Sequence, residues 1–461
     1  MNNGFSLRLA TIADTLAARP VEADAEFTGV STDTRSLKAG DLFVALTGEN
    51  FDGHDYLAKA QGRGAVAALV DHAVAGVSLP QLVVKDTRRA YGQIGRLWRR
   101  RFNIPTLALT GSNGKTTVKE MLRGILVAHT GDAGAVLATQ GNLNNDVGVP
   151  QMLLCLRPQH RYAVFELGMN HLGEIDHLTR LVEPDVAMVT MAGTAHIGEL
   201  GSREAIARAK GEIYAGLKAD GIAVVNMHDR FGNYWHDLVQ GRRVIAFGIA
   251  PVDDVVGTFG ADANGAGTLG ITWRGGHITV RLQVPGKHNL SNALAAAAGA
   301  CALDIPLETI RRGLENFSGV EGRLATFAGH NSATIIDDTY NANPDSVKAA
   351  IRVLAARKPP RYLVLGDMGE LGDGSVEMHR EVGAYARAAG IEKLYALGDM
   401  SRETAAAFGA GATHFGTADE LASSLQPLLA PQSSVLVKGS RFMKMERVVE
   451  KLVPHYGGGH H

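Results

Sequence analysis

The sequence predicts an α/β protein of three domains. These are a small N-terminal α/β domain over residues 1–84, a central parallel-sheet domain with a P-loop over 85–325 and a doubly wound, Rossmann-like domain over 326–461. The 461 residues exceed the usual size of a single domain, which is about 150 residues. After residue 105, apolar runs of strand length alternate with helical segments, a pattern typical of parallel sheets covered on both faces.

The first domain repeats this alternation on a shorter scale. A strand is predicted over residues 41–46, a helix over 56–62 and a second strand over 65–70. Two loops are dense in hydrogen-bonding groups: one spans 48–54, and the other contains Ser31, Thr32, Asp33 and Arg35. Such loops form turns and caps, or they recognise a polar ligand, and the pattern leaves both possibilities open.

Residues 85–105 predict a helix that leads into the central domain. Its apolar residues Tyr91, Ile94, Leu97 and Trp98 share one face. The run of arginines over 99–101 is interpreted as a solvated face of this helix.

The sequence TLALTGSNGKTT, residues 106–117, has the form of a strand, a glycine-rich turn and a helix start. Glycines let the main chain approach an anion closely, and the unpaired N–H groups of a helix N-terminus bind phosphate. The general P-loop pattern has a glycine where this chain has Leu109, so the match is to a shorter variant, TGxxGKTT. We therefore expect a triphosphate cradle, with the Thr116 hydroxyl facing Mg2+. Its residues are Gly111, Ser112, Asn113, Gly114, Lys115, Thr116 and Thr117.

Further strands of the central domain are predicted at 162–168, 185–190, 221–227 and 243–248, followed over 249–285 by a peripheral hairpin. Ligands of open parallel sheets lie beyond the carboxyl ends of the strands. Glu166 closes one strand, and His196 lies in a glycine-flanked loop. A buried glutamate at a strand end needs a partner, which favours a metal-binding role for Glu166.

Lys210 lies beside the apolar stripe of a helix predicted over 202–217, with Ser202 as its N-cap. On the pattern alone, Lys210 is a lysine whose amine reaches solvent along the helix surface.

The last domain is predicted to hold four strands, at 333–340, 361–368, 393–400 and 433–440. Their ends carry an aspartate or a Lys-Gly pair. Polar residues at four neighbouring strand ends favour a site on that edge of the sheet.

Composition excludes several classes of protein. Lys plus Arg number 46 and Asp plus Glu 47, a balance that argues against a general nucleic-acid or membrane-surface binder. The two cysteines, Cys155 and Cys301, have apolar neighbours, as expected for core residues in a reducing compartment. No signal peptide is evident and no apolar run is long enough for a bilayer, so we expect a cytoplasmic protein without membrane insertion.

Six motifs occur in order: TGSNGKTT, an ELGM strand end, AHIGELGS, ARAKGEI, GKHNLSNALAA and DDTYNANP. Together they resemble the Mur ligase family of ATP-dependent amide-forming enzymes over almost the whole chain. STDTRSLKAGDLFVAL, TQGNLNNDVGVPQMLL, YNANPDS and VLGDMGELG are similar to the members that add D-alanyl-D-alanine to UDP-N-acetylmuramoyl-tripeptide. The sibling enzyme that adds the third amino acid carries an Asp-Asn-Pro-Arg run, which this sequence lacks.

The resemblance implies a role for each matching residue. It places the ATP phosphates and one of two Mg2+ ions at Lys115 and Thr116, and further metal contacts at Glu166, His196 and a carbamylated Lys210. It implies contacts of Asn292 with adenine, Arg323 with phosphate and Asp338 with ribose. Lys115, Lys210, His196 and Arg323 would serve catalysis. The uridine diphosphate would be bound by Ser31, Thr32 and Arg35, and the dipeptide by Asn341, Asn343, Asp367 and Glu370.

The implied reaction forms an acyl phosphate from ATP and a substrate carboxylate, which the amine of the dipeptide then attacks. The expected partners are these small molecules, and we expect a monomer whose third domain closes onto the central one. Another Mur-type ligase or a folylpolyglutamate ligase would share the last two domains. A nucleotide-gated switch or a kinase that stops at phosphorylation would also need the phosphate turn.

Overall fold

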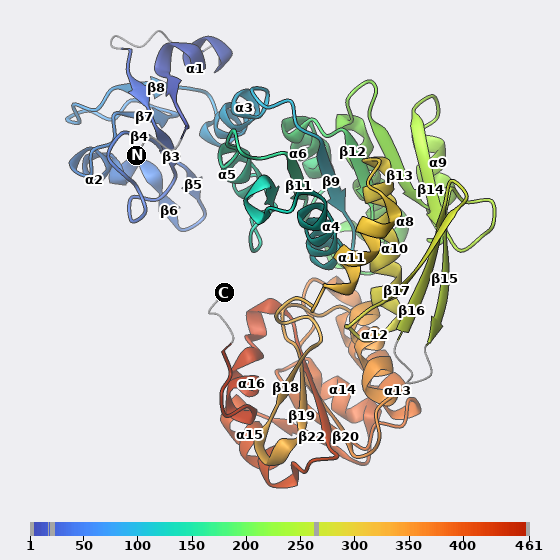
Figure 1. Cartoon of the computed structure of the whole chain (residues 1–461). Helices are drawn as coiled ribbons and strands as arrows, with labels where there is room; N and C mark the ends of the chain where they lie inside the picture. Colours follow the sequence, from blue (N-terminus) through green and yellow to red (C-terminus); the bar gives the residue numbers. More distant parts are fainter. Residues whose placement is uncertain (1–3, 17, 19–23, 262–266, 458–461) are drawn as a thin grey trace.

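A computed structural model describes residues 4–16, 18, 24–261 and 267–457. Three sheets, one after another along the chain, form the cores of three domains (Figure 1). The N-terminal and C-terminal domains both lie against the central one. Within the described residues, no helix is at once long and apolar enough to cross a membrane.

The N-terminal domain contains a parallel sheet in the order β3-β4-β7-β8. Its strands are β3 (Gly29–Ser31), β4 (Asp41–Val44), β7 (Ala67–Val70) and β8 (Gln81–Val83). The short 3-10 helix η1 (Gly53–Tyr56) and α2 (Leu57–Gly62) connect the small hairpin of β5 (Thr47–Gly48) and β6 (Phe51–Asp52) to β7. At the chain start, β1 (Leu7–Arg8) pairs with β2 (Glu26–Phe27), and α1 (Leu9–Leu16) follows β1. The predicted strands and helix of this domain are present with shorter bounds.

The central sheet has the order β10-β11-β9-β12-β13-β14-β15-β16-β17. Its parallel part consists of β9 (Thr106–Thr110), β10 (Val136–Ala138), β11 (Tyr162–Glu166), β12 (Val186–Val189), β13 (Ile222–Asn226), β14 (Arg243–Gly248) and the start of β15 (Val255–Ala261). Strand β9 lies between β11 and β12, so the carboxyl ends of these three strands meet at one place.

Alternate residues of these strands are buried in two separate cores, one on each face of the sheet. One face is covered by α4 (Lys115–Thr130), α10 (Lys287–Ala302) and α11 (Leu307–Glu315). The other is covered by α3 (Thr87–Arg99), α5 (Gly148–Leu154), α6 (Glu174–Val182), α8 (Arg203–Gly211) and α9 (Gly232–Leu238). The doubly covered parallel sheet that the apolar strands predicted is confirmed.

The peripheral hairpin predicted within residues 249–285 is present, and it forms the antiparallel edge of the central sheet. Strands β15, β16 (Gly267–Trp273) and β17 (Gly276–Arg281) continue the central sheet in antiparallel pairing. Leu269 and Ile271 of β16 are buried in the core beneath α10. The alternating apolar residues therefore mark one buried face of a longer sheet rather than an isolated hairpin.

The prediction that residues 99–101 form a solvated face is wrong for Arg99, which is buried. Its guanidinium donates hydrogen bonds to the carbonyls of Val182 and Phe102 and to Thr106 Oγ1. Arg99 lies eight residues after Tyr91, on the buried face of α3, and burial lowers the pKa of its guanidinium. Arg100 and Arg101 are both exposed, as predicted.

The C-terminal sheet has six strands, in the order β18-β19-β23-β20-β21-β22, where the sequence predicted four. They are β18 (Ala325–Ala328), β19 (Thr334–Asp338), β20 (Arg361–Gly366), β21 (Lys393–Leu397), β22 (Ala412–Phe415) and β23 (Ser434–Lys438). The two missed strands are the edges, whose partly exposed residues lack a continuous apolar run. Helices α12 (Pro344–Ala355), α13 (Ser375–Ala388), α14 (Ser401–Phe408), α15 (Ala418–Leu425) and α16 (Glu446–Leu452) cover the faces.

Candidate active site

The glycine-rich turn over 111–114 joins β9 to α4 and is held from two sides. Thr190 Oγ1, at the end of β12, donates a hydrogen bond of 2.8 Å to the carbonyl of Asn113. Gly114 has a positive φ of 82°, and a Cβ at this position would lie 2.3 Å from Asn292 Oδ1. Only glycine satisfies both the backbone angle and the close contact with α10. The side chain of Asn292 therefore lies directly beside the main chain of the turn.

Lys115 is the first residue of α4, and its ammonium donates a hydrogen bond of 2.8 Å to the carbonyl of Gly111. Burial lowers the pKa of Lys115, whereas the Glu166 carboxylate opposes this shift. The amine is thus folded back over the turn, beside the free N–H groups of the helix N-terminus. This combination of a helix terminus and a cation is suited to a polyanion.

A cleft of about 1880 Å³ runs along the turn, between the central and C-terminal domains. Predicted site residues that line it are Ser112, Asn113, Gly114, Lys115, Thr116, Thr117, Glu166, His196, Asn292, Arg323, Asp338, Asn341, Asn343 and Glu370. Predicted residues that do not line it are Gly111, Lys210, Asp367, Ser31, Thr32 and Arg35.

Glu166 ends β11 next to the turn and is only 3% exposed. Its Oε1 accepts a hydrogen bond of 2.8 Å from Asn144 Nδ2, and its backbone N–H donates to Thr139 Oγ1 at 2.9 Å. Its Oε2 is buried without a hydrogen-bond partner among the described residues. A buried carboxylate oxygen with an open lone pair fits a divalent cation, because hard cations prefer carboxylate ligands.

Lys210 lies on α8 and is 1% exposed, so it is not the solvent-reaching lysine that its pattern suggested. Helix α8 begins after Ser202, whose side chain accepts a hydrogen bond from the backbone N–H of Ala205, as predicted. Burial and then the nearby charge of Lys115 lower the pKa of Lys210 well below its usual value. Within the described residues, its amine has no hydrogen bond or ion pair. Lys210 is therefore a buried amine within electrostatic range of the phosphate turn, and burial favours its neutral form over its charged form.

His196, in the central domain, contacts Glu370 of the C-terminal domain. Its Nδ1 lies 2.8 Å from Glu370 Oε2, in a close ionic contact that is poorly aligned as a hydrogen bond. This contact lowers the pKa of Glu370. Both residues have positive φ, 64° for His196 and 61° for Glu370. Non-glycine residues in this conformation carry about 1 kcal/mol or more of strain, and they cluster at functional sites.

Arg323 lies in the segment that joins the two domains. It donates a hydrogen bond of 2.9 Å to Thr116 Oγ1, and its guanidinium stacks 4.3 Å from the ring of Tyr340. Asp338, at the end of β19, forms a buried ion pair of 2.7 Å with Lys438 at the end of β23. Positive groups from both domains thus face the phosphate turn.

Two further contacts fix the domains against each other. Asn343 caps α12 and donates from Nδ2 to Asn113 Oδ1 at 2.9 Å. Asp345 accepts hydrogen bonds from the backbone N–H and the hydroxyl of Thr194 and from Arg203. The closed arrangement is therefore maintained by residues more than 140 positions apart in sequence.

Two groups of predicted residues lie elsewhere. Ser31 ends β3 of the N-terminal domain, and Thr32 and Arg35 lie in the loop after it, where Arg35 pairs with Asp33 at 2.6 Å and its side chain is 85% exposed. Asp367 is buried and accepts hydrogen bonds from the N–H and the hydroxyl of Ser401. Its carboxylate supports the start of α14 and does not line the cleft, whereas the other predicted dipeptide residues do.

Three residues that support this cleft were not predicted from the sequence: Asn144, Asp345 and Lys119. Lys119 is buried and donates a hydrogen bond of 2.6 Å to the carbonyl of Thr139, whose hydroxyl contacts Glu166. Its position four residues after Lys115 on α4 was a usable signal. Asn144 and Asp345 act through contacts that sequence spacing does not reveal, whereas Lys438 belongs to the Lys-Gly strand end where a polar site was predicted.

Comparisons with known proteins agree with this architecture. Three family models match: "Mur ligase family, catalytic domain" over residues 26–99, "Mur ligase middle domain" over 109–300 and "Mur ligase, glutamate ligase domain" over 322–441. The chain is 41% identical to UDP-N-acetylmuramoyl-tripeptide–D-alanyl-D-alanine ligase of Escherichia coli, over 97% of this chain and 98% of the relative.

Solved structures with the same fold include a crystal structure of MurF from Acinetobacter baumannii. It has a TM-score of 0.91 and 37% identity, and the match covers 98% of this chain and 100% of the other. MurF ligase from Thermotoga maritima in complex with ADP has a TM-score of 0.81 and 26% identity, with 92% and 96% covered. With this identity along nearly its whole length and three matching domains, the chain belongs to the Mur ligase family.

Proposed function

We propose that this enzyme uses ATP to join D-alanyl-D-alanine to UDP-N-acetylmuramoyl-tripeptide, a step of peptidoglycan precursor synthesis. The observation that carries the proposal is the convergence of Lys115, Glu166 and Arg323 on one cleft between two domains. The relatives with this name match along the whole chain, which supports the same substrates here.

The charges in the cleft suit the first step, in which a substrate carboxylate attacks the γ-phosphate of ATP and ADP leaves. Two unit charges about 4 Å apart repel by about 4 kcal/mol at an effective dielectric constant of about 20. Without compensation, this repulsion would slow the reaction by about three powers of ten. We assign the compensation to the N–H groups of the turn, to Lys115 and to Arg323, which bind and orient the phosphates.

We propose that Thr116, Glu166 and His196 would hold Mg2+, with room for two ions along the cleft. The orphaned Oε2 of Glu166 supports this assignment. When bound, Mg2+ supplies charge compensation between the phosphate and carboxylate oxygens. A hydrogen bond from Arg323 orients the Thr116 hydroxyl, and a hydrogen bond from Asn144 orients the Glu166 carboxylate.

We infer that Lys210 carries a carbamate. A neutral lysine amine attacks the carbon of CO2 and loses a proton, which leaves an anionic group on the side chain. Burial lowers the pKa of this amine and so favours the neutral form that the attack requires. The carbamate would replace an unpartnered amine beside Lys115 by an anion that can pair with a cation.

We assign the remaining contacts by domain, with boundaries near residues 84 and 325. Asn292 and Asp338 would contact adenosine, and Ser31, Thr32 and Arg35 would contact the uridine diphosphate. Asn341, Asn343 and Glu370 line the cleft on its C-terminal side, where the dipeptide would enter. Asp367 would act by supporting that wall. We further propose that the enzyme works in the cytoplasm as a monomer on small-molecule substrates.

The test is incubation of the protein with ATP, Mg2+, UDP-N-acetylmuramoyl-tripeptide and D-alanyl-D-alanine. We expect one ADP and one phosphate for each amide formed, and a product whose mass equals the two substrates less one water. ADP release without added dipeptide, or a phosphorylated product without an amide, would reject the proposal. Acceptors with lysine or diaminopimelate at the third position would identify the preferred peptide.

A further inference from the structure

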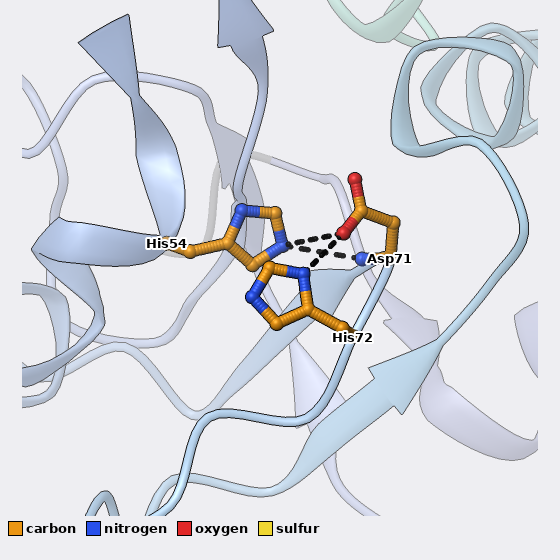
Figure 2. A group of neighbouring side chains, drawn as sticks. All are labelled: His54, Asp71 and His72. Atoms are coloured by element: carbon orange, nitrogen blue, oxygen red, sulfur yellow. Dashed lines mark hydrogen bonds and ion pairs between the residues drawn. The ribbon is translucent and has the colours of Figure 1, made fainter.

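Three potential metal ligands meet in the N-terminal domain, outside the cleft: His54, Asp71 and His72 (Figure 2). His54 belongs to η1, whereas Asp71 and His72 follow the last residue of β7. One ligand atom from each residue lies within 4.8 Å of the others. The cluster is thus formed by two segments that a short helix separates in sequence.

The partners of His54 determine its protonation. Its Nδ1 lies 2.6 Å from Asp52 Oδ1, and the backbone N–H of Asp71 donates to its Nε2 at 3.2 Å. Because a carboxylate only accepts, Nδ1 carries the proton, and the lone pair of Nε2 points toward Asp71. This tautomer is the one that metal-ligating histidines adopt when a carboxylate orients the ring from behind.

The three side chains of the cluster differ in how far they are exposed to solvent. The His54 side chain is 4% exposed, Asp71 37% and His72 61%. The buried ring is fixed, while the two outer ligands can adjust and leave a coordination position open to solvent. Three protein ligands with one open position are a recurrent arrangement for Zn2+.

The distances agree with such a site. His54 Nε2 lies 3.3 Å from Asp71 Oδ1, and two ligands about 2.0 Å from a tetrahedral ion are about 3.3 Å apart. His72 Nδ1 is closer to the same oxygen, at 2.6 Å, and its ring stacks on His54 with a centroid distance of 4.2 Å. The exposed His72 must therefore turn to coordinate, which breaks the hydrogen bond between its Nδ1 and Asp71 Oδ1.

We propose that His54, Asp71 and His72 bind one divalent transition-metal ion, best Zn2+, with Asp52 as the group that orients His54. Two imidazoles and one carboxylate favour Zn2+, Co2+ or Ni2+ over Mg2+ and Ca2+, which prefer oxygen ligands. The Asp71 N–H already bonded to His54 Nε2 competes with the ion, so binding is reversible rather than structural.

The bound ion would link η1 to the end of β7. This edge also carries Ser31, because β3, β4 and β7 are parallel neighbours in one sheet. Ser31 is level with Ala68 of β7, so two strand spacings and an offset of three residues place Asp71 about 14 Å from the end of β3. The ion would thus stabilise the edge that contains the proposed uridine diphosphate loop, and this last point rests on the proposed function.

The test is calorimetric titration of the chelator-treated full-length protein with Zn2+ and spectroscopic titration with Co2+, both in excess Mg2+. His72→Ala and Asp71→Asn remove exposed ligands, so folding is not at risk. His277→Ala, on the exposed edge of β17, is the matched control. All proteins keep the terminal His460 and His461, which can bind the same ions.

We expect the wild type and His277→Ala to bind one more ion than His72→Ala and Asp71→Asn, or to bind it at least tenfold more tightly. Asp52→Asn replaces the carboxylate that orients His54 by an amide that can still cap η1, and it should weaken binding about 10- to 100-fold. The same difference should persist in a Glu166→Gln background, which separates this site from the proposed magnesium site. Equal stoichiometry and affinity in all these proteins would overturn the proposal and leave His54 as a core histidine.

Discussion

The phosphate cleft and the N-terminal loop differ in how their polar groups are held. Around the turn over 111–114, partners come from distant parts of the chain: Arg323 contacts Thr116 across 207 positions, and Asn343 contacts Asn113 across 230. In the loop after β3, Arg35 bonds to Asp33 only two residues away. One site is assembled by the packing of two domains, and the other is organised by its own turn.

This difference has a consequence for binding. Glu166 is buried, Lys115 and Arg323 are half-buried, and hydrogen bonds already orient all three, so they lose little entropy when a ligand arrives and contribute strongly to catalysis. Arg35 is exposed and screened by solvent, so its contribution to binding is small. Substitutions should therefore have large effects on turnover in the cleft and small effects on substrate affinity in the loop.

Lys115→Ala provides the strongest test of this comparison. Loss of the ammonium beside the helix N-terminus should reduce turnover by about 10³-fold, measured as ADP release in the presence of both substrates. Lys393→Ala, an exposed lysine at the start of β21, is the control and should be unaffected. Near-normal turnover in Lys115→Ala would mean that the phosphates lie elsewhere.

Lys210→Ala should reduce turnover by about 10²-fold, because the proposed carbamate is lost. Short carboxylic acids, which can occupy the space of the carbamate, should partly restore activity. The same acids should leave Lys115→Ala inactive, which is the matched comparison. Full activity of Lys210→Ala without added acid would contradict the carbamate assignment.

The lowered pKa of Lys210 also predicts a pH effect on stability. Because the pKa of Lys210 is lowered in the folded state, this state binds fewer protons at the lysine than the unfolded state does below the normal pKa of 10.5. In CO2-free buffer, stability should therefore rise with pH up to that value. Lys210→Met should be more stable than the wild type near pH 7 and should lose this part of the pH dependence. Chemical denaturation at several pH values measures the free energy of unfolding of both proteins. If this free energy changed with pH in the same way in both, the buried amine would keep its proton.

The contrast between the two regions also explains what the sequence could predict. The strand, turn and helix around Lys115 depend on local spacing, so TGSNGKTT was sufficient to locate them. Glu166 was predicted to be buried because it ends an apolar strand, and it is. Asn144 could not be predicted as its partner, because the contact depends on how a loop 22 residues earlier folds over β11.

Local patterns failed where tertiary packing determines the environment. On its local pattern alone, Lys210 was interpreted as a surface lysine. The apolar stripe of a helix does not reveal that η3 (Glu212–Gly216) and the central sheet cover the side of α8 that carries this lysine. Arg99 was assigned to solvent because the charged run outweighed the helical spacing from Tyr91. The residues of the domain interface, such as Asp345, lie on a surface that exists only after two domains meet.

Asp345→Ala tests whether domain packing maintains the cleft. The substitution leaves the Thr194 N–H and Arg203 without their shared acceptor, a loss of about 2 kcal/mol for hydrogen bonds to a charged group. We expect kcat to fall about tenfold and small-angle X-ray scattering to report a larger radius of gyration. Asp373→Ala, on the nearby exposed η5 (Gly372–Gly374), is the control. An unchanged kcat would show that other contacts suffice for closure.

Arg35→Ala should have the smallest effect and, for that reason, distinguishes the regions most sharply. An exposed arginine facing a diphosphate contributes about 1 kcal/mol, which corresponds to about a fivefold increase in KM for the UDP substrate. The KM for ATP and kcat should not change, because Arg35 lies outside the cleft. Arg8→Ala is the matched control, since Arg8 is also exposed, lies in the same domain and pairs with a nearby aspartate, Asp24, at 2.7 Å. A loss of kcat in Arg35→Ala as large as that in Lys115→Ala would mean that the loop acts on the reacting groups, and the division between a binding domain and a catalytic cleft would be wrong.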